Sequence, residues 1–307
     1  MPIESPLFLL AFDHRSGLVR GMLRGQETRA GELLPDAKQV IYEGVRSAGA
    51  GRIAGSAGAE PAGERSWQPG VLVDEQYGGS VVGPAKAAGL ATAVAIEASG
   101  QDEFELEYGD DAAAHIEALA PTYAKVLVRY NPGGDASANA RQCERLAEVS
   151  RMVAATSSEL LFELLVPPTT AQLDSVHGDR DRYDAELRPQ LTIDTIAAFQ
   201  AAGVEAPLWK LEGFETVEQA EAVARQGGAP CIVLGRNAPQ ERVEHWLSVA
   251  AAAEGWEGFA IGRSIWWGAI SGYLHDGLPR DVAVEQIAAQ YAQAIDVYLA
   301  AEQRAAV

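Results

Sequence analysis

Residues 207–235 read PLWKLEGFETVEQAEAVARQGGAPCIVLG, and this stretch contains one complete strand–helix–strand unit. Its two ends, 207–213 and 231–235, are short apolar runs, and the segment 216–226 between them carries apolar residues at helical spacing. Continuous apolar runs are typical of parallel strands that are covered on both faces. The stretch therefore predicts two parallel strands joined by a helix.

The same alternation of strand and helix continues toward both ends of the chain. Helical patterns are expected at 139–155, 192–202 and 281–301. About eight strand–helix units predict a single (β/α)₈ TIM barrel over residues 1–307. A doubly wound open sheet is the second interpretation, but the turn after the first strand, AFDHRSG, lacks the GxGxxG pattern of that fold. The other expected strands are LFLLAF (7–12), VLVD (71–74), TAVAIE (92–97), AKVLVRY (124–130), LLFELLV (160–166) and GFAIG (258–262).

Three connecting segments differ from the rest in composition. Residues 49–70 are rich in Gly and Ala and precede a strand, which places them on the stability face of a barrel, and they predict a flexible surface excursion. Residues 167–189 follow a strand on the catalytic face and are long enough to form a lid. The acidic segment 99–111 lies on that same face.

Charge and composition exclude several classes of partner. The chain has 43 acidic and 24 basic residues and a net charge of −19, which argues against binding to nucleic acid or to anionic membrane surfaces. The apolar run near the N-terminus is short and has no basic lead-in, so neither a signal peptide nor a membrane span is expected, and the cytoplasm is the predicted location. Cys143 and Cys231 are expected to be buried and unpaired.

Lysine is scarce, and its placement is informative. Of four lysines, Lys38 and Lys86 lie in helical patterns and are interpreted as surface residues, whereas Lys125 and Lys210 lie inside apolar strands. A buried cation is costly, and the chain uses arginine for most of its positive charges. An amine can lose its proton and attack a carbonyl group, which a guanidinium cannot do. The strand lysines therefore indicate amine chemistry.

The two strand lysines fall on alternate strands, which contribute to the same interior layer of a barrel. Two ammonium groups close together disfavour each other's charge, and burial lowers the pKa of a lysine further. Both effects would supply free amine at neutral pH. In the alternative interpretation, each lysine of the pair Lys125 and Lys210 belongs to a buried ion pair with Glu163 or Glu212.

Other polar side chains gather where the expected strands end, which is the place of catalytic sites in barrels. They are Asp13, His14, Asp74, Glu75, Gln76, Glu97, Arg129, Glu163 and Glu212. Two Gly-Arg turns, Gly235-Arg236 and Gly262-Arg263, follow the seventh and eighth strands, where barrels often bind phosphate. These residues predict a polar site with an anion-binding corner.

Metal and triad chemistry have little support in the sequence. The five histidines are scattered, and none shows ligand spacing. Neither GxSxG nor a Cys/His arrangement is present. No metal site and no cofactor are therefore expected.

Several stretches together resemble the family of 2-deoxy-5-keto-gluconate 6-phosphate aldolases, the aldolase domain of bacterial inositol catabolism. The resemblance extends from Leu7 to Tyr298, and it is more distant to class I tagatose-bisphosphate and sulfofructose-phosphate aldolases. The chain differs in its Gly/Ala-rich segment 49–70, and its 307 residues include no kinase domain, which often precedes the aldolase in that family. The stretches are LLAFDHRSG, VDEQYG, SGQDEFELEYGDD, KVLVRYNPGGD, YDAELRP, WKLEG, IVLGR and FAIGRSIWW.

The resemblance implies a class I aldolase, a carbon–carbon lyase that works through a Schiff base. It assigns the Schiff base to Lys210, further catalytic roles to Lys125, Glu163 and Asp13, and the substrate phosphate to Arg263. The implied substrate is 2-deoxy-5-keto-gluconate 6-phosphate, which would yield dihydroxyacetone phosphate and malonate semialdehyde. The alternatives are another ketose phosphate, or a phosphosugar-binding barrel without turnover. The expected partner is thus a small phosphosugar, and the sequence is compatible with a homo-oligomer.

Overall fold

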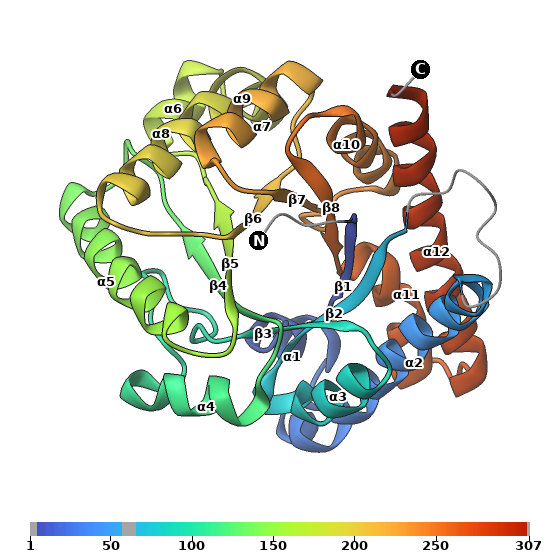
Figure 1. Ribbon diagram of the computed structural model, residues 1–307. Coiled ribbons are helices and arrows are strands. Elements are labelled where there is room, and N and C mark those ends of the chain that lie inside the picture. The colour runs from blue at the N-terminus through green and yellow to red at the C-terminus, as the bar shows by residue number, and fades with distance from the viewer. Residues whose placement is uncertain (1–4, 57–65, 306–307) are drawn as a thin grey trace.

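The computed structural model describes residues 5–56 and 66–305, and its centre is a closed barrel of parallel strands in the order β1 to β8 (Figure 1). This confirms the predicted (β/α)₈ barrel, and a strand forms at each of the eight apolar runs. The strands are β1 (Leu7–Ala11), β2 (Gln68–Asp74), β3 (Ala91–Ala95), β4 (Tyr123–Arg129), β5 (Glu159–Leu165), β6 (Leu208–Glu212), β7 (Cys231–Leu234) and β8 (Trp256–Ile261).

Helices surround the barrel, and the four helical patterns taken from the sequence correspond to α5, α8, α9 and α12. Apolar side chains on the outer face of the strands pack against these helices and form the larger of two core clusters. The helical elements are α1 (Ser16–Met22), η1 (Glu27–Arg29), α2 (Ala30–Ser56), α3 (Glu75–Ala87), η2 (Gly109–Asp111), α4 (Ala112–Leu119), α5 (Ala136–Ala154), α6 (Thr170–Ser175), α7 (Arg180–Arg182), η3 (Tyr183–Leu187), α8 (Arg188–Ala201), α9 (Val217–Gly227), α10 (Gln240–Ala252), α11 (Arg263–His275) and α12 (Arg280–Ala305).

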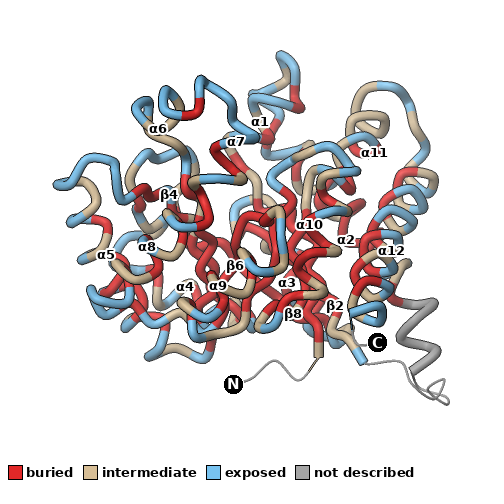
Figure 2. The backbone as a smooth tube through the Cα atoms, turned by 90° about the horizontal axis from the view of Figure 1, so that it is seen from above, coloured by how far each residue is buried: buried red, intermediate tan, exposed pale blue. Residues whose placement is uncertain are grey.

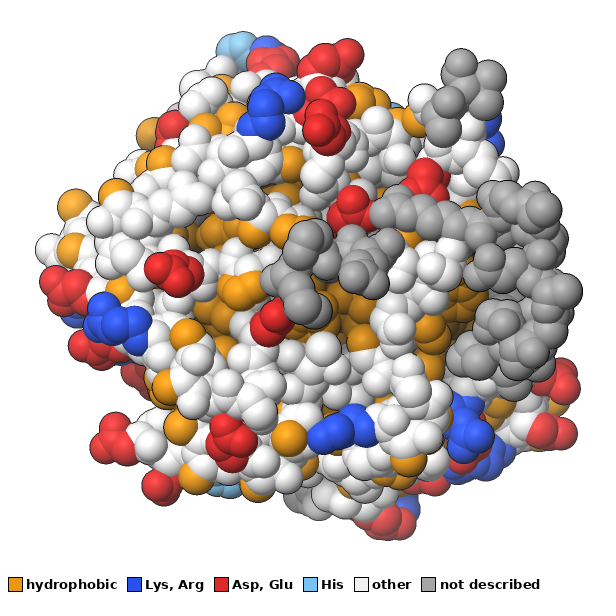
Figure 3. Space-filling model, viewed as in Figure 1, with side chains coloured by type: hydrophobic (Ala, Val, Ile, Leu, Met, Phe, Trp, Pro, Cys, Tyr) orange, Lys and Arg blue, Asp and Glu red, His pale blue; other side chains and the backbone are white. Residues whose placement is uncertain are grey.

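The inside of the barrel is apolar toward the N-terminal ends of the strands. A smaller core cluster fills this part, with Leu7, Leu161 and Leu208 among its members. In Figure 2 the described chain begins at the end of the barrel opposite α1 and α6, and Figure 3 shows apolar side chains gathered at the centre of that end. Polar chemistry inside the barrel is therefore confined to the C-terminal ends of the strands.

Two of the unusual segments contain helices or strands in the parts that the structure describes. Of the predicted excursion 49–70, the first part continues α2 to Ser56, the last part belongs to β2, and residues 57–65 lie outside the described residues. The predicted lid 167–189 folds into α6, α7, η3 and the start of α8. Its second half is anchored, because the buried Tyr183 donates a hydrogen bond of 2.8 Å to the Val166 carbonyl.

The structure also tests two smaller predictions. Cys231 is buried as expected, but Cys143 is only half-buried, and both are free thiols. Cys143 lies on α5 with its Sγ 4.0 Å from the Tyr130 hydroxyl. No helix in residues 5–56 and 66–305 is long and apolar enough to cross a membrane.

Candidate active site

Glu163 on β5 joins the two strand lysines. Its Oε2 atom lies 2.9 Å from Nζ of Lys125 on β4 and 2.9 Å from Nζ of Lys210 on β6. Glu163 and Lys210 are register partners, so they lie at the same height in the barrel. Leu161 and Leu208 face the interior of the barrel. Side chains two residues apart on a strand point to the same face, so Glu163 and Lys210 face the interior as well. The fold thus brings both lysines to one carboxylate.

Lys125 is surrounded by carboxylates. Its Nζ lies 2.7 Å from Asp13 Oδ2 and 3.0 Å from Glu97 Oε1, in addition to Glu163, and its side chain is 1% exposed. Burial alone would lower the pKa of Lys125, but Asp13, Glu163 and Glu97 raise it well above its ordinary value. The expectation of a lowered pKa is therefore wrong for Lys125. It is a fixed ammonium group, because the carboxyl groups around it outweigh the cost of burial.

Lys210 has a simpler environment. Among the described residues, Glu163 is its one carboxylate within ion-pair distance. Glu212, the other partner considered for the lysines, does not contact Lys210. The Lys210 side chain is 5% exposed and lines the cavity described below.

The carboxylates around the lysines differ in their protonation. Burial raises the pKa of Asp13 and of Glu163, but Lys125 and Lys210 more than offset it, and both pKa values fall below the ordinary range. Burial also raises the pKa of Glu97, and there Asp13 adds to the rise, while Lys125 offsets only part of it. The cluster therefore holds two ionised carboxylates and one carboxyl group that is disposed to keep its proton.

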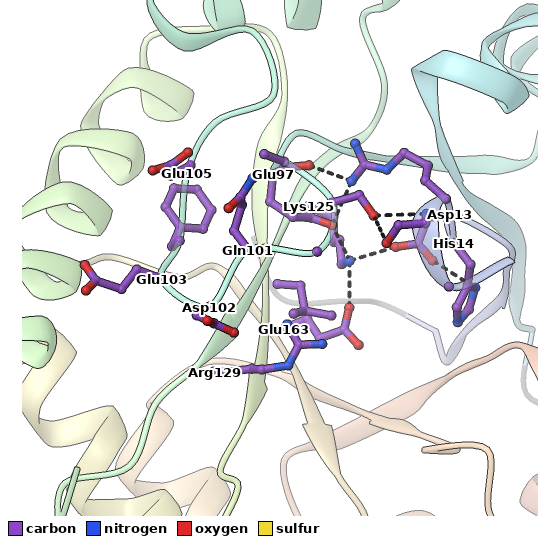
Figure 4. A pocket seen from close by; sticks show the side chains of 18 of the residues that line it. Asp13, His14, Glu97, Gln101, Asp102, Glu103, Glu105, Lys125, Arg129 and Glu163 are labelled. Carbon is purple, nitrogen blue, oxygen red and sulfur yellow. Dashed lines mark hydrogen bonds and ion pairs between the residues drawn. The ribbon is translucent and has the colours of Figure 1, made fainter. Parts of the chain in front are cut away.

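A cavity of about 280 Å³ opens above this cluster, and Figure 4 shows Lys125 at its centre with Asp13, Glu97 and Glu163 around it. Its volume is near the lower end of the range for small-molecule sites, about 300 Å³. The acidic segment 99–111 forms one wall of the cavity. The cationic side chains on its rim are Arg20, Arg129 and Arg263.

Arg263 reaches this cavity from the turn after β8. It is the first residue of α11, and Gly262 before it packs closely against β1, since an added Cβ would lie 2.4 Å from the Ala11 carbonyl oxygen. No carboxylate of the described residues lies within ion-pair distance of Arg263. A half-buried guanidinium at the start of a helix is suited to hold an anion. Arg129, at the end of β4, is exposed and lines the same cavity.

His14 lies next to Asp13, with 3.8 Å between Nδ1 and the Asp13 Oδ1 atom. Burial lowers the pKa of His14 to about 4, and Arg263 and the two lysines add to this while Asp13 opposes it. The ring is therefore neutral at neutral pH. It lines the cavity and can exchange hydrogen bonds with a ligand there.

Asp74 and Gln76 are among the predicted binding residues that do not line this cavity. Asp74 is fully buried, accepts a 2.8 Å hydrogen bond from the Tyr77 amide at the start of α3, and pairs with Lys38. Lys38 is thus not a surface residue as predicted, because its ammonium group also donates to the His14 carbonyl at 3.1 Å and is buried. Gln76 is exposed and lines an adjoining, more open hollow beside Tyr77, which shares residues such as Arg15 and Ser99 with the cavity.

The Gly-Arg turn after β7 also differs from the prediction. Arg236 pairs with Glu212 at 2.9 Å and with Asp184 of η3, so its charge is already neutralised and does not face the cavity. Glu212 accepts a further hydrogen bond of 3.0 Å from the Val166 amide. Gly235 packs against Ile261, 3.2 Å from the position of an added Cβ. Glu212 and Arg236 therefore help to anchor the segment 167–189, Gly235 packs against β8, and none of the three lines the cavity.

Sequence reasoning gave Glu97 no role beyond that of a polar side chain at a strand end, and it did not consider Arg15. Arg15 is buried and joins Glu97 to the acidic segment through a 2.9 Å ion pair with Glu107. Their positions directly after β1 and β3 were the available signal, since barrel sites use such positions.

Metal ligation is a separate question. In the described part of the chain, no group of three His, Cys, Asp or Glu residues is arranged to hold a metal ion. Asp13, Glu97 and Glu163 do converge, but they converge on the ammonium group of Lys125.

Comparison with known proteins gives a family and a fold. A family model described as "Uncharacterized protein conserved in bacteria (DUF2090)" matches residues 3–302. Among solved structures, the fold is similar to the crystal structure of Cgl0159 from Corynebacterium glutamicum. The two chains are 18% identical, with a TM-score of 0.57, over 96% of this chain and 87% of that one. No curated protein is significantly similar to the sequence. At this identity the structural likeness shows the fold alone.

Proposed function

We propose that this chain, which belongs to the DUF2090 family of bacterial proteins, is a class I aldolase. Its substrate would be a phosphorylated keto sugar acid, cleaved through a Schiff base on Lys210. The observation that carries this proposal is the unequal environment of two adjacent lysines. Lys125 has three carboxylates and Lys210 has one, and both line the cavity. An accessible lysine beside a permanent cation is the arrangement that amine catalysis needs.

The reaction follows from these neighbours. The Lys210 amine attacks the ketone, and loss of water leaves a protonated imine that withdraws electrons as the carbon–carbon bond breaks. Glu163, which is ionised and lies 2.9 Å from Lys210, takes the proton of the substrate hydroxyl and later returns it to the enamine carbon. Asp13 is the second candidate for this role. Lys125 binds a substrate oxygen as a fixed cation.

The substrate assignment rests on the rim of the cavity and on the resemblance noted in the sequence. Arg263 holds the phosphate, and Arg129 lies on the same rim. The leading substrate is 2-deoxy-5-keto-gluconate 6-phosphate, which yields dihydroxyacetone phosphate and malonate semialdehyde. Both the sugar acid and dihydroxyacetone phosphate carry the phosphate next to the ketone carbon, so one anion site serves both.

Borohydride trapping tests the proposal. Reduction in the presence of dihydroxyacetone phosphate should add one reduced adduct to the peptide that contains Lys210, as read by mass spectrometry. Lys210→Arg keeps the charge but removes the attackable amine, so the adduct should vanish and turnover should fall by more than about a thousandfold. Lys86→Arg is the matched control, because Lys86 is exposed and bonds only backbone carbonyls of Leu119 and Ala120.

The other outcomes of the trapping experiment are equally informative. An adduct on Lys125 would exchange the roles of the two lysines. Full activity without any adduct would rule out the Schiff base. Binding of phosphosugars without release of dihydroxyacetone phosphate, from any phosphorylated ketose or sugar acid tested, would identify a binding barrel without turnover.

A further inference from the structure

We propose that Glu97 is the proton donor of this site and that it protonates the hydroxyl group that leaves the Lys210 adduct as water. The proposal rests on the Schiff-base function proposed above and adds a catalytic residue to it. It starts from the surroundings of the Glu97 carboxyl group. Glu97 lines the cavity, and one of its two carboxyl oxygens is buried without a hydrogen-bond partner among the described residues.

The two oxygens of Glu97 have different surroundings. Oε1 accepts a hydrogen bond of 3.0 Å from Lys125 and lies 3.4 Å from Nη2 of Arg15. Oε2 is the buried oxygen without a partner. A buried carboxylate oxygen without a donor is costly, because the charge it carries is neither solvated nor hydrogen-bonded. Protonation of Oε2 removes that cost, and no acceptor among the described residues holds the proton. Because Glu97 lines the cavity, rotation of its carboxyl group would bring this proton to a ligand.

Charged groups reach Glu97 from each neighbouring element. Asp13 follows β1, Lys125 belongs to β4, and Arg15 precedes α1. Arg15 also forms an ion pair with Glu107 of the acidic segment. Burial and Asp13 favour the neutral acid, and Lys125 and Arg15 stabilise the carboxylate once the proton has left. The two cations thus allow Glu97 to release its proton and to take it back.

The neighbouring carboxyl groups of Asp13 and Glu163 favour the ionised form instead. The cluster therefore offers one group as an acid and two as bases. Asp13 and Glu163 are held ionised by the lysines, so they can accept a proton but have none to give. Pairs of carboxyl groups whose environments drive their pKa values apart are a recurrent sign of separate acid and base roles. Glu97 is the member of this cluster that can start the reaction protonated.

The proposed step balances as follows. Attack by Lys210 on the ketone gives a carbinolamine, in which carbon carries both the hydroxyl group and the nitrogen. The carbon–oxygen bond breaks, the oxygen takes the proton of Glu97 and leaves as water, and the nitrogen lone pair forms the protonated imine. Glu97 is then a carboxylate. When the product imine is hydrolysed, water adds to carbon and Glu97 takes back one proton.

The experiment measures formation of the reduced adduct in rapid-mixing trapping with dihydroxyacetone phosphate, as a function of pH. In the wild type, the rate should fall at high pH as Glu97 loses its proton. Glu97→Gln can still accept a hydrogen bond from Lys125 but cannot donate an acidic proton. It should form the adduct about 10²–10⁴-fold more slowly and lose the fall at high pH.

Controls separate this proposal from the others. Glu148→Gln changes an exposed glutamate of α5 and should keep the wild-type profile. Glu97→Asp retains an acid and should keep the fall at high pH, and it serves as the test variant if Glu97→Gln does not fold. A wild-type rate and profile in Glu97→Gln, or no fall at high pH in a folded Glu97→Asp, would overturn the role of Glu97. Absence of any adduct in the wild type would instead overturn the Schiff-base function.

Discussion

At the scale of single residues, the carboxylates around each lysine decide what its amine can do. Three of them hold Lys125 as an ammonium group, which can bind a substrate oxygen but has no lone pair for attack. Lys210 meets one carboxylate in the described part of the chain and faces the cavity. Arginine would provide the charge at either position but could not provide the amine.

The second residue-scale prediction concerns anion binding. Arg263→Ala should raise the KM for phosphorylated substrate by tenfold to more than a hundredfold, because a charge-assisted hydrogen bond contributes roughly 1.5–3 kcal/mol. The kcat should change less. Arg236→Ala is the comparison, since Arg236 is paired with Glu212 and Asp184 and its loss should lower thermal stability instead. Sulfate soaked into crystals and bound away from Arg263 would contradict this assignment.

His14 provides a pH-dependent prediction for stability. Its pKa falls from 6.5 in the unfolded chain to about 4 in the folded protein, so the unfolded chain binds the proton first as the pH decreases. The contribution of His14 is therefore complete above pH 6.5 and is lost as the pH falls toward 4. In urea unfolding, the wild type should lose stability relative to His14→Gln across this interval. A difference between the two proteins that does not change with pH would refute the shift.

At the scale of elements, the contact between β8, α11 and β1 positions the anion site. Gly262→Ala would place a Cβ 2.4 Å from the Ala11 carbonyl oxygen and 3.3 Å from His14 Cε1. We expect a loss of about 1–3 kcal/mol in the free energy of unfolding together with weaker phosphate binding, because α11 must move away from β1. The measurements are urea unfolding and KM.

The same helix offers a matched control. Gly268 lies in the middle of α11 with no atom within 4 Å of an added Cβ. Gly268→Ala should therefore stabilise the protein by about 0.5–1 kcal/mol, since alanine is the better helix former. If both variants behaved alike, helix propensity rather than the contact with β1 would explain the result.

At the scale of the whole molecule, the proposed chemistry predicts independence from metal ions. The protonated imine on Lys210 supplies the electron sink that Zn²⁺ supplies in metal-using aldolases. Activity should therefore survive exhaustive chelation at full level, measured as release of dihydroxyacetone phosphate. A loss of activity that added Zn²⁺ restores would be incompatible with this mechanism.

The barrel and the positions of the central residues were predictable because both depend on local patterns. Apolar runs such as 160–166 and 207–213 specify buried parallel strands, and a lysine or glutamate inside such a run must face either the helices or the barrel interior. Scarcity then singled out Lys125 and Lys210. Their position at the end of a strand made Asp13, Glu97 and others candidates for the site. It could not rank them, because the C-terminal end of every strand in a barrel reaches the same face.

What the sequence by itself determined is the order of the strands and helices, and with it the set of side chains at the catalytic end. Only the tertiary structure decided which of them meet. Arg236 forms ion pairs with Glu212 and Asp184. Lys38 pairs with the buried Asp74, and Glu97 contacts Lys125. Long charged side chains can reach several partners, and their pairing and their pKa values depend on distances between strands far apart in the chain. Local sequence contains the residue types, whereas those distances exist only after the barrel closes.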